Sequence, residues 1–87
     1  MKISGNTVLI TGGATGLGLE LAKIFIENKN EVIIFDINED ASDAAKGQYP
    51  ELSTYICDIG RKKDLERCFQ EVLTTFPNLN ILINNHV

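Results

Sequence analysis

A glycine-rich stretch, Thr11 to Gly18 (TGGATGLG), holds the residues of this chain that are best suited to binding an anion. It follows an apolar run and precedes a helical pattern, so its glycines fall where a buried strand ends and a helix begins. Gly12 allows the positive φ of a tight turn, Gly16 lets the backbone approach a diphosphate, and Gly18 lets the helix pack close to the sheet. Because the N–H groups at a helix start attract anions, the stretch predicts phosphate binding, although the glycines alone also fit a plain strand-to-helix turn.

A carboxylate follows these glycines in the sequence at the spacing expected of a nucleotide-binding site. The run Glu31 to Asp36 (EVIIFD) is typical of a second buried strand, and it ends in the acid Asp36. Rossmann-type nucleotide sites place a ribose-binding acid about 20 residues beyond their glycines. Asp36 could also be a turn residue that ends a strand. Together with the glycines, its position favours the ribose role.

The length, charge and composition of the chain argue against several classes of function. The chain has 87 residues and a formal net charge of -4, which predicts one domain at most and, without a basic patch, argues against a nucleic-acid partner. Apolar runs are too short for a membrane span, and the N-terminus lacks the apolar region of a signal peptide. We therefore expect a cytoplasmic protein.

The cysteines and the histidine carry no recognisable metal or redox motif. Cys57 and Cys68 fall in a predicted strand and a predicted helix, without a CxxC pattern, so buried reduced thiols are favoured over a redox or metal role. His86 has no partner at ligand spacing. The sequence thus predicts no metal site.

Beyond the glycines, strand and helix patterns alternate along the chain. We expect strands at 7–10, 31–36, 52–57 and 80–84. The first helix is expected to bury one face made of Leu17, Leu21, Ile24 and Phe25. The last helix, from residue 61 to a stop at Pro77, is expected to bury Leu65, Phe69, Val72, Leu73 and Phe76.

A short middle helix completes the alternation. Asn38 is expected to cap a helix over 39–46 that Gly47 and Pro50 close, and Gly60 is an acceptable cap for the last helix. Four successive apolar residues within 31–36 suit a parallel strand covered on both faces, which requires helical crossovers. We therefore predict an α/β fold over residues 1–87. Its form is a Rossmann-type doubly wound parallel sheet of about four strands with flanking helices, a partial fold.

Four motifs in order resemble those of the short-chain dehydrogenase/reductase family. TGGATGLG matches the family's TGxxxGxG, and Asp36 stands where NAD-preferring members carry an acid. Asp58-Ile59 matches the pair beside the adenine, and Asn84-Asn85 matches the start of NNAG. The resemblance runs from about Asn6 to Asn85, which is the N-terminal third of a typical member.

The resemblance implies a cofactor site in which each part of a dinucleotide has its residues. Those expected to bind it are Gly12, Gly16, Leu17 and Gly18 at the diphosphate, Asp36 at the adenosine ribose, Asp58 and Ile59 at the adenine, and Asn85 at the nicotinamide ribose, and Ile37 is also expected to bind the cofactor. Asn84 is expected to tie strands together. Asp58 fits equally well as an acid at a helix start.

The implied cofactor is NAD rather than NADP. A carboxylate at Asp36 repels a 2′-phosphate, and neither positions 13–15 nor position 37 supplies an Arg or Lys to offset it.

Two departures from the family limit what the chain is expected to do. His86-Val87 stands where the family continues with Ala-Gly, and neither Tyr49 nor Tyr55 has a Lys four positions later. The family's YxxxK pair and its partner Ser supply the acid–base chemistry of hydride transfer. We therefore expect the NAD-binding N-terminal segment of an oxidoreductase that acts on a carbonyl or alcohol, truncated, binding dinucleotide weakly and inactive alone.

An alternative is a non-catalytic nucleotide-binding or self-assembling module. The apolar run Ile81 to Ile83 is expected to form an open sheet edge, which is prone to pairing with another chain. We expect a homo-oligomer joined through that edge or an adjoining helix face.

Overall fold

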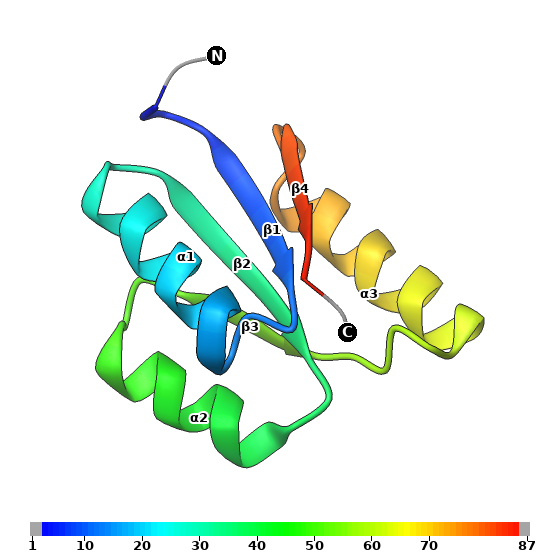
Figure 1. The fold of residues 1–87 in the computed structure, drawn as a ribbon. Coiled ribbons are helices and arrows are strands. Elements are labelled where there is room, and N and C mark those ends of the chain that lie inside the picture. The colour runs from blue at the N-terminus through cyan, green and yellow to red at the C-terminus, as the bar shows by residue number, and fades with distance from the viewer. Residues whose placement is uncertain (1–2, 86–87) are drawn as a thin grey trace.

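The computed structural model describes residues 3–85, which form a four-stranded parallel sheet with helices on both faces (Figure 1). The strand order is β3-β2-β1-β4. In chain order the elements are β1 (Thr7–Thr11), α1 (Gly16–Glu27), β2 (Glu31–Asp36), α2 (Glu39–Gln48), β3 (Ser53–Ile56), α3 (Lys62–Thr75) and β4 (Ile81–Asn84). This arrangement confirms the predicted Rossmann-type partial fold.

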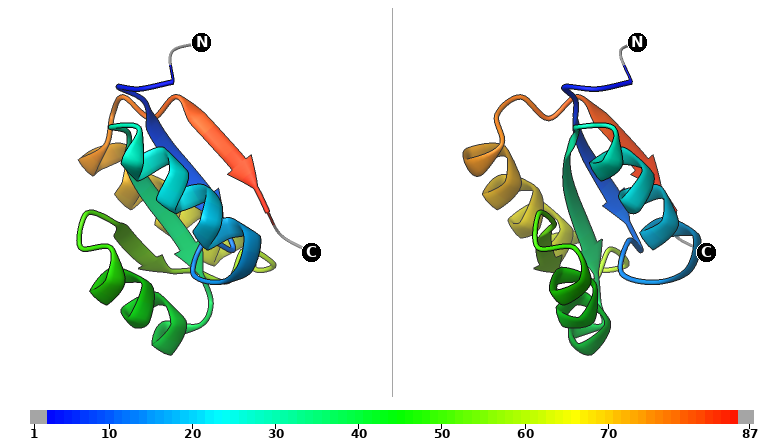
Figure 2. Two further views of the ribbon diagram at one scale, coloured as in Figure 1. Left: turned by 60° about the vertical axis from the view of Figure 1, so that its left-hand side comes forward. Right: turned by 90° about the vertical axis from the view of Figure 1, so that its left-hand side faces the viewer.

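The register of the sheet brings the ends of the strands to one edge. β1 lies between β2 and β4, with Thr11 opposite Phe35 on one side and Asn84 on the other. Since every pairing is parallel, the carboxyl ends of all four strands point the same way (Figure 2). The segments that follow β1, β2, β3 and β4 therefore meet at this edge, where open α/β sheets bind ligands.

Two apolar layers sandwich the sheet. On the side of α1 and α2, buried residues include Val8, Ile10, Val32, Ile34, Ala22 and Ala45. On the side of α3 they include Leu9, Ile33, Phe35, Cys57, Cys68 and Val72. Because successive strand residues point to opposite faces, β1 and β2 must be apolar throughout to fill both layers.

The predicted helix faces are partly wrong. Leu17 is 67% exposed and Ile24 is 53% exposed, whereas α1 buries Gly18 and Ala22. The helix packs closely through small residues, and this turns the larger side chains at 17 and 24 toward solvent. In α3, Leu73 is likewise exposed, while Cys68 and Val72 are buried.

Several element boundaries also differ from the predictions. Asn38 caps α2 as expected, since its Oδ1 accepts the Ala41 N–H at 2.9 Å, but the helix continues through Gly47 to Gln48. Arg61 rather than Gly60 is the N-cap of α3, and β3 is two residues shorter than expected.

No helix within residues 3–85 has the length and apolarity needed to cross a bilayer. The predictions that concern His86 lie outside the described residues.

Candidate functional site

The turn between β1 and α1 adopts a conformation that requires glycine. Gly12 has φ +67° and Gly16 has φ +57°, a region that side chains disfavour. The Gly12 N–H donates a 2.7 Å hydrogen bond to the Phe35 carbonyl at the end of β2. A Cβ at Gly12 would also lie 3.0 Å from the Asn85 carbonyl oxygen. The tight turn predicted for Gly12 is confirmed, and its backbone is fixed against β2.

Close packing at Gly18 is also confirmed. A Cβ there would overlap the Gly12 carbonyl oxygen and lie 2.8 Å from the Asn85 side-chain nitrogen. Gly13, which the sequence analysis did not single out, is equally constrained, because its Cβ would lie 2.8 Å from Cβ of Ile34. The paired glycines at 12 and 13 were the available signal for this contact. The turn thus lies against both β2 and the segment after β4.

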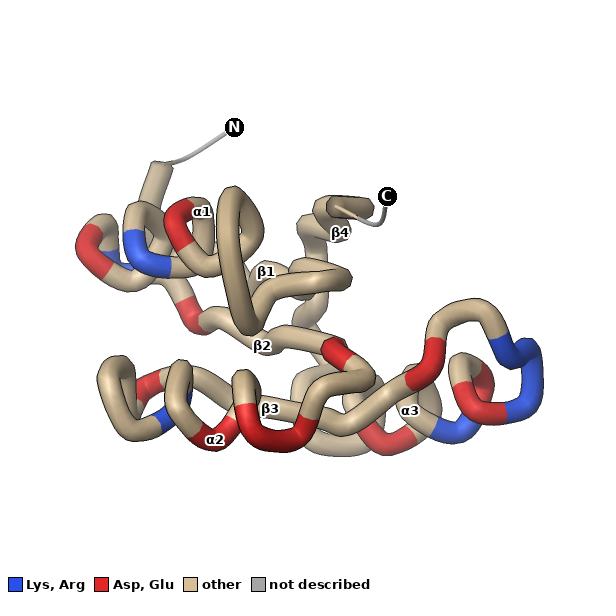
Figure 3. The backbone as a smooth tube through the Cα atoms, turned by 60° about the horizontal axis from the view of Figure 1, so that its bottom comes forward, with Lys and Arg blue, Asp and Glu red and all other residues tan. Residues whose placement is uncertain are grey.

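The first turn of α1 is left open to an anion. Thr15 is the N-cap residue but makes no side-chain cap hydrogen bond, and the first turn contains no acidic residue. Figure 3 shows no charged residue between β1 and the start of α1. No side chain within the turn caps the partial positive charge of the helix start, and the carboxylate that lies beside it is that of Asp36, which accepts the Ala14 N–H.

Asp36 lies against the glycine-rich turn. Its Oδ2 accepts the Ala14 N–H at 3.2 Å and its Oδ1 accepts the Asn38 N–H at 3.0 Å. An ionised carboxylate has about four lone-pair sites, so two bonds leave capacity for hydroxyl donors from a ligand. The two parts of the predicted nucleotide motif are thus neighbours in space.

A pocket of about 100 Å³ opens at the carboxyl ends of β2 and β3. It is lined by Gly12, Phe35, Asp36, Ile37, Cys57, Asp58 and Ile59. Five of these residues were predicted to bind the cofactor, and Phe35 packs edge-on against Phe69 with ring centroids 5.5 Å apart. Whole-ligand pockets are usually about 300–1,000 Å³, so this one suits a single ring with apolar walls.

Asp58 has a local structural role at this pocket. Its Oδ1 accepts the Gly60 N–H at 3.0 Å, and its own N–H donates to the Asp64 carboxylate at 2.7 Å. That N–H, with the Arg67 guanidinium, holds the pKa of Asp64 below its ordinary value. Asp58 therefore shapes the entry to α3 while its side chain lines the pocket.

Asn84 and Asn85 connect β4 to the glycine-rich turn. The Thr11 hydroxyl donates to Asn84 Oδ1 at 3.1 Å, so Asn84 ties β1 to β4 as expected. The Asn85 N–H donates to Thr11 Oγ1 at 3.1 Å, and its side-chain nitrogen donates to the Gly12 carbonyl at 3.2 Å. Asn85 thus supports the turn, and its expected ribose contact stays a prediction.

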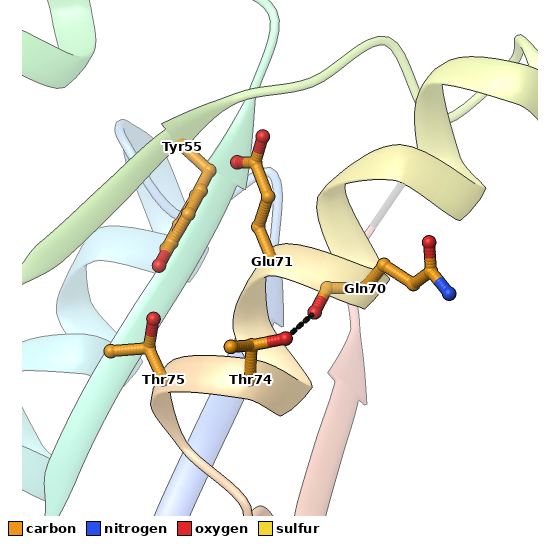
Figure 4. A pocket seen from close by; sticks show the side chains of 5 residues that line it. All are labelled: Tyr55, Gln70, Glu71, Thr74 and Thr75. Atoms are coloured by element: carbon orange, nitrogen blue, oxygen red, sulfur yellow. Dashed lines mark hydrogen bonds between the residues drawn. The ribbon is translucent and has the colours of Figure 1, made fainter.

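A larger hollow, about 620 Å³, lies between β3 and the C-terminal half of α3 (Figure 4). Two of its polar groups bond along the helix: the Thr74 hydroxyl donates to the Gln70 carbonyl at 2.9 Å, and Glu71 pairs with Arg67 at 3.2 Å. None of the predicted cofactor residues lines this hollow, whereas five line the smaller pocket, so the candidate site is the glycine-rich edge.

Comparison with known proteins identifies the family of this chain. The family model described as short chain dehydrogenase matches residues 6–86. The uncharacterized oxidoreductase DltE of Bacillus subtilis (strain 168) is 47% identical over 85 residues, which cover 98% of this chain and 34% of that protein. The chain therefore spans about a third of the length of the curated relatives it matches.

Solved structures share the fold. A short chain dehydrogenase from Bacillus anthracis str. 'Ames Ancestor' superposes with a TM-score of 0.89 at 24% identity, over 99% of this chain and 36% of that one. The 3-ketoacyl-(acyl-carrier-protein) reductase from Brucella melitensis, solved in complex with NADH, gives a TM-score of 0.84 at 26% identity, over 93% and 34% of the two chains.

Proposed function

Because the chain belongs to the short chain dehydrogenase family, we propose that it is the dinucleotide-binding segment of an NAD-dependent oxidoreductase. The whole enzyme would transfer hydride between NAD and a carbonyl or alcohol substrate. The observation that carries the proposal is the 3.2 Å hydrogen bond from the Ala14 N–H to the Asp36 carboxylate. That bond puts the acid directly beside a glycine-rich turn whose helix start has no side-chain cap.

The geometry supports an extended dinucleotide along the carboxyl edge. The backbone from Thr15 to Gly18 offers N–H groups to the diphosphate, and the uncapped start of α1 adds favourable electrostatics. Asp36 accepts hydrogen bonds from the adenosine ribose hydroxyls, and the pocket of about 100 Å³ receives the adenine between Ile37 and Ile59. The nicotinamide end lies toward Asn85.

Asp36 supports a preference for NAD over NADP. A 2′-phosphate would be placed beside this carboxylate, and like charges at close range repel. Residues 13–15 and 37 provide no Arg or Lys to bind the phosphate. The NADH in the Brucella melitensis reductase belongs to that protein, and its fold similarity makes the same class of cofactor reasonable here.

We further propose that the chain binds cofactor without catalysing hydride transfer alone. Neither Tyr49 nor Tyr55 is followed by a Lys four residues later, so the sequence supplies no YxxxK acid–base pair. Tyr55 instead lies against Phe35, with ring centroids 5.9 Å apart and the rings edge to face.

Calorimetric titration of the purified chain with NAD, NADP and ADP-ribose tests the proposal. We expect NAD and ADP-ribose to bind in the millimolar range or tighter and NADP to bind more weakly. The variant Asp36→Asn should reduce the difference between NAD and NADP, while Asp43→Asn, an exposed acid on α2, should leave it unchanged. Absence of binding by NAD and ADP-ribose at millimolar concentration would contradict the binding role.

The edge of the sheet supports a second proposal, self-association. Within residues 3–85, β4 pairs with β1 on one side and has no strand on the other, and its Leu82 is 56% exposed. Leu82 also borders an apolar hollow of about 310 Å³ that Leu65 and Phe69 line. We propose that a second copy of the chain pairs at this edge, because an uncovered apolar edge strand is a template for pairing.

Sedimentation velocity distinguishes this association from a stable monomer. Leu82→Lys should shift the chain to monomer by placing a charge on the edge. Ile24→Lys, at a similarly exposed position on α1, is the matched control and should leave the association unchanged. A wild-type monomer at tens of micromolar would reject the proposal.

A further inference from the structure

Three side chains with ligand-type atoms meet where β3 ends and α3 begins, and of these only Cys57 also lines the proposed adenine pocket. The sulfurs of Cys57 and Cys68 and a carboxylate oxygen of Asp64 all lie within 4.8 Å of one another. Cys57 directly follows β3, while Asp64 and Cys68 stand four residues apart on α3 and so share one face of that helix. The fold therefore joins three ligand-type side chains from two elements that are separate in sequence.

The cluster is enclosed on the sulfur side and open on the carboxylate side. Cys57 is 2% exposed and Cys68 is 0% exposed, whereas Asp64 is partly buried. Both thiols are free. Each sulfur makes a long contact with a backbone carbonyl, Cys57 with Asp64 at 3.9 Å and Cys68 with Ile56 at 3.7 Å. Such S–H contacts are weak, so a stronger ligand for sulfur could replace them.

The Asp64 carboxylate keeps one site for an ion beside its present hydrogen bonds. Its Oδ2 accepts the Asp58 N–H at 2.7 Å, and its Oδ1 accepts two N–H groups of the Arg67 guanidinium at 2.7 and 3.2 Å. An ionised carboxylate has about four lone-pair sites, so these three bonds leave one. A thiol that coordinates a metal loses its proton, so the two sulfurs would bind as thiolates.

We propose that Cys57, Cys68 and Asp64 bind one thiophilic divalent cation, with Zn²⁺ as the physiological candidate. Zinc accepts cysteine sulfur at about 2.3 Å and carboxylate oxygen at about 2.0–2.2 Å in tetrahedral sites. Ligand atoms around such an ion lie roughly 3.5–3.8 Å apart, so rotamer adjustments of about 1 Å would close this cluster on it. Water or a backbone carbonyl completes the fourth position.

Binding exchanges protons for the metal without any redox step. Each thiol gives its proton to solvent as its sulfur bonds to the ion, and the Asp64 oxygen bonds without losing a proton. The Arg67 guanidinium, 2.7 Å from Asp64 Oδ1, offsets part of the negative charge of two thiolates and one carboxylate. Affinity should therefore rise with pH.

Titration of the reduced, chelator-treated full chain with Co²⁺ and Zn²⁺ tests the site. We expect one ion per chain, sulfur-to-cobalt charge-transfer absorption, tetrahedral cobalt bands, and displacement of Co²⁺ by Zn²⁺. The melting temperature should rise with Zn²⁺, because an ion that binds the folded state stabilises it. A phosphine reductant keeps the thiols from forming a disulfide during the titration.

Variants separate this site from other ligands. Cys68→Val should abolish the charge-transfer bands, and Cys57→Ser should weaken them strongly. Asp64→Asn, which leaves both sulfurs in place, should lower the affinity about tenfold or more. His86→Ala removes the one histidine of the sequence and should change nothing.

Two results would overturn the assignment. One is a wild-type chain that binds no stoichiometric Co²⁺ or Zn²⁺ when reduced. The other is a folded Asp64→Asn variant that binds the metal with wild-type affinity and whose cobalt spectrum lacks sulfur charge transfer. That result would place the ion elsewhere on the chain.

Discussion

The helices α1 and α2 begin at the same edge of the sheet and cover the same face, yet their first turns are built differently. In α2, Asn38 accepts the Ala41 N–H at 2.9 Å, and the acids Glu39 and Asp40 follow. In α1, Thr15 makes no cap bond and the first turn has no acid. The start of α2 is capped by its own side chains, whereas the start of α1 has no side-chain cap, which is the arrangement expected of the proposed diphosphate site.

Asp36 connects the two helix starts. One of its oxygens accepts an N–H from Ala14, before α1, and the other accepts an N–H from Asn38, before α2. The carboxylate thus fixes the spacing between the open helix start and the capped one. We infer that replacing the cap residue Asn38 of α2 should affect stability, while replacing the cap residue Thr15 of α1 should affect it much less.

The largest contrast is expected between two helical glycines. Gly18→Ala should destabilise the chain by about 1–3 kcal/mol, because a Cβ there overlaps the Gly12 carbonyl. Gly47→Ala, in α2, should stabilise it by about 0.5–1 kcal/mol, since a Cβ there meets nothing within 4 Å and alanine favours helix. Urea unfolding measures both. If both variants changed the free energy of unfolding by the same amount and in the same direction, α1 would not depend on the close approach of Gly18 to the Gly12 carbonyl.

The capping residues should give a smaller contrast. Asn38→Ala should cost about 1 kcal/mol, because it removes the acceptor for the Ala41 N–H. Thr15→Ala should change stability by less than about 0.5 kcal/mol, since no cap bond is lost. Thermal or urea unfolding of both variants provides the measurement. A cost at Thr15 as large as at Asn38 would show that the start of α1 is capped after all.

The smallest effect on stability is expected at α3, where a carboxylate in the first turn, Asp64, makes the hydrogen bonds near the helix start. Asp64 accepts the Asp58 N–H at 2.7 Å and pairs with Arg67, and these contacts lower its pKa in the folded chain. A lowered folded pKa contributes stability above the ordinary value of 3.8, and that contribution is lost as pH falls through the folded value. Asp64→Asn should therefore make the free energy of unfolding fall less steeply as the pH is lowered into the acid range.

Unfolding midpoints measured from neutral pH down to acid test this effect. Glu66→Gln is the matched control on the same helix, because its pairing with Lys62 at 4.0 Å is highly exposed. The control should keep the wild-type acid limb. An unchanged acid limb in Asp64→Asn would show that its hydrogen bonds do not stabilise the folded state.

The sequence was sufficient for the features that repeat along the chain. Continuous apolar runs predicted the doubly covered strands β1 and β2, and the glycines with Asp36 predicted which residues meet at the carboxyl edge. These features could be predicted from the sequence because strand order and chain direction bring the ends of parallel strands together. The cap at Asn38 could be predicted as well, because it depends on residues only three positions apart.

Features that depend on packing distance could not be read in this way. Leu17 and Ile24 fit an apolar helical face, but α1 approaches the sheet through Gly18 and Ala22, which turns both outward. The constraint at Gly13 arises from Ile34, far along the chain. The grouping of Cys57 with Cys68 and Asp64 likewise depends on how α3 lies against the end of β3.

The most direct test of the central claim is an NMR titration of the isotope-labelled chain with NAD, following the backbone amide signals. If the open start of α1 and Asp36 hold the dinucleotide, the signals of Gly16, Leu17 and Gly18 should move with those of Asp58 and Ile59. Those of Glu39 and Asp40 at the capped start of α2 should move much less. Saturable shifts confined to other residues, or no shifts at millimolar NAD, would contradict the claim.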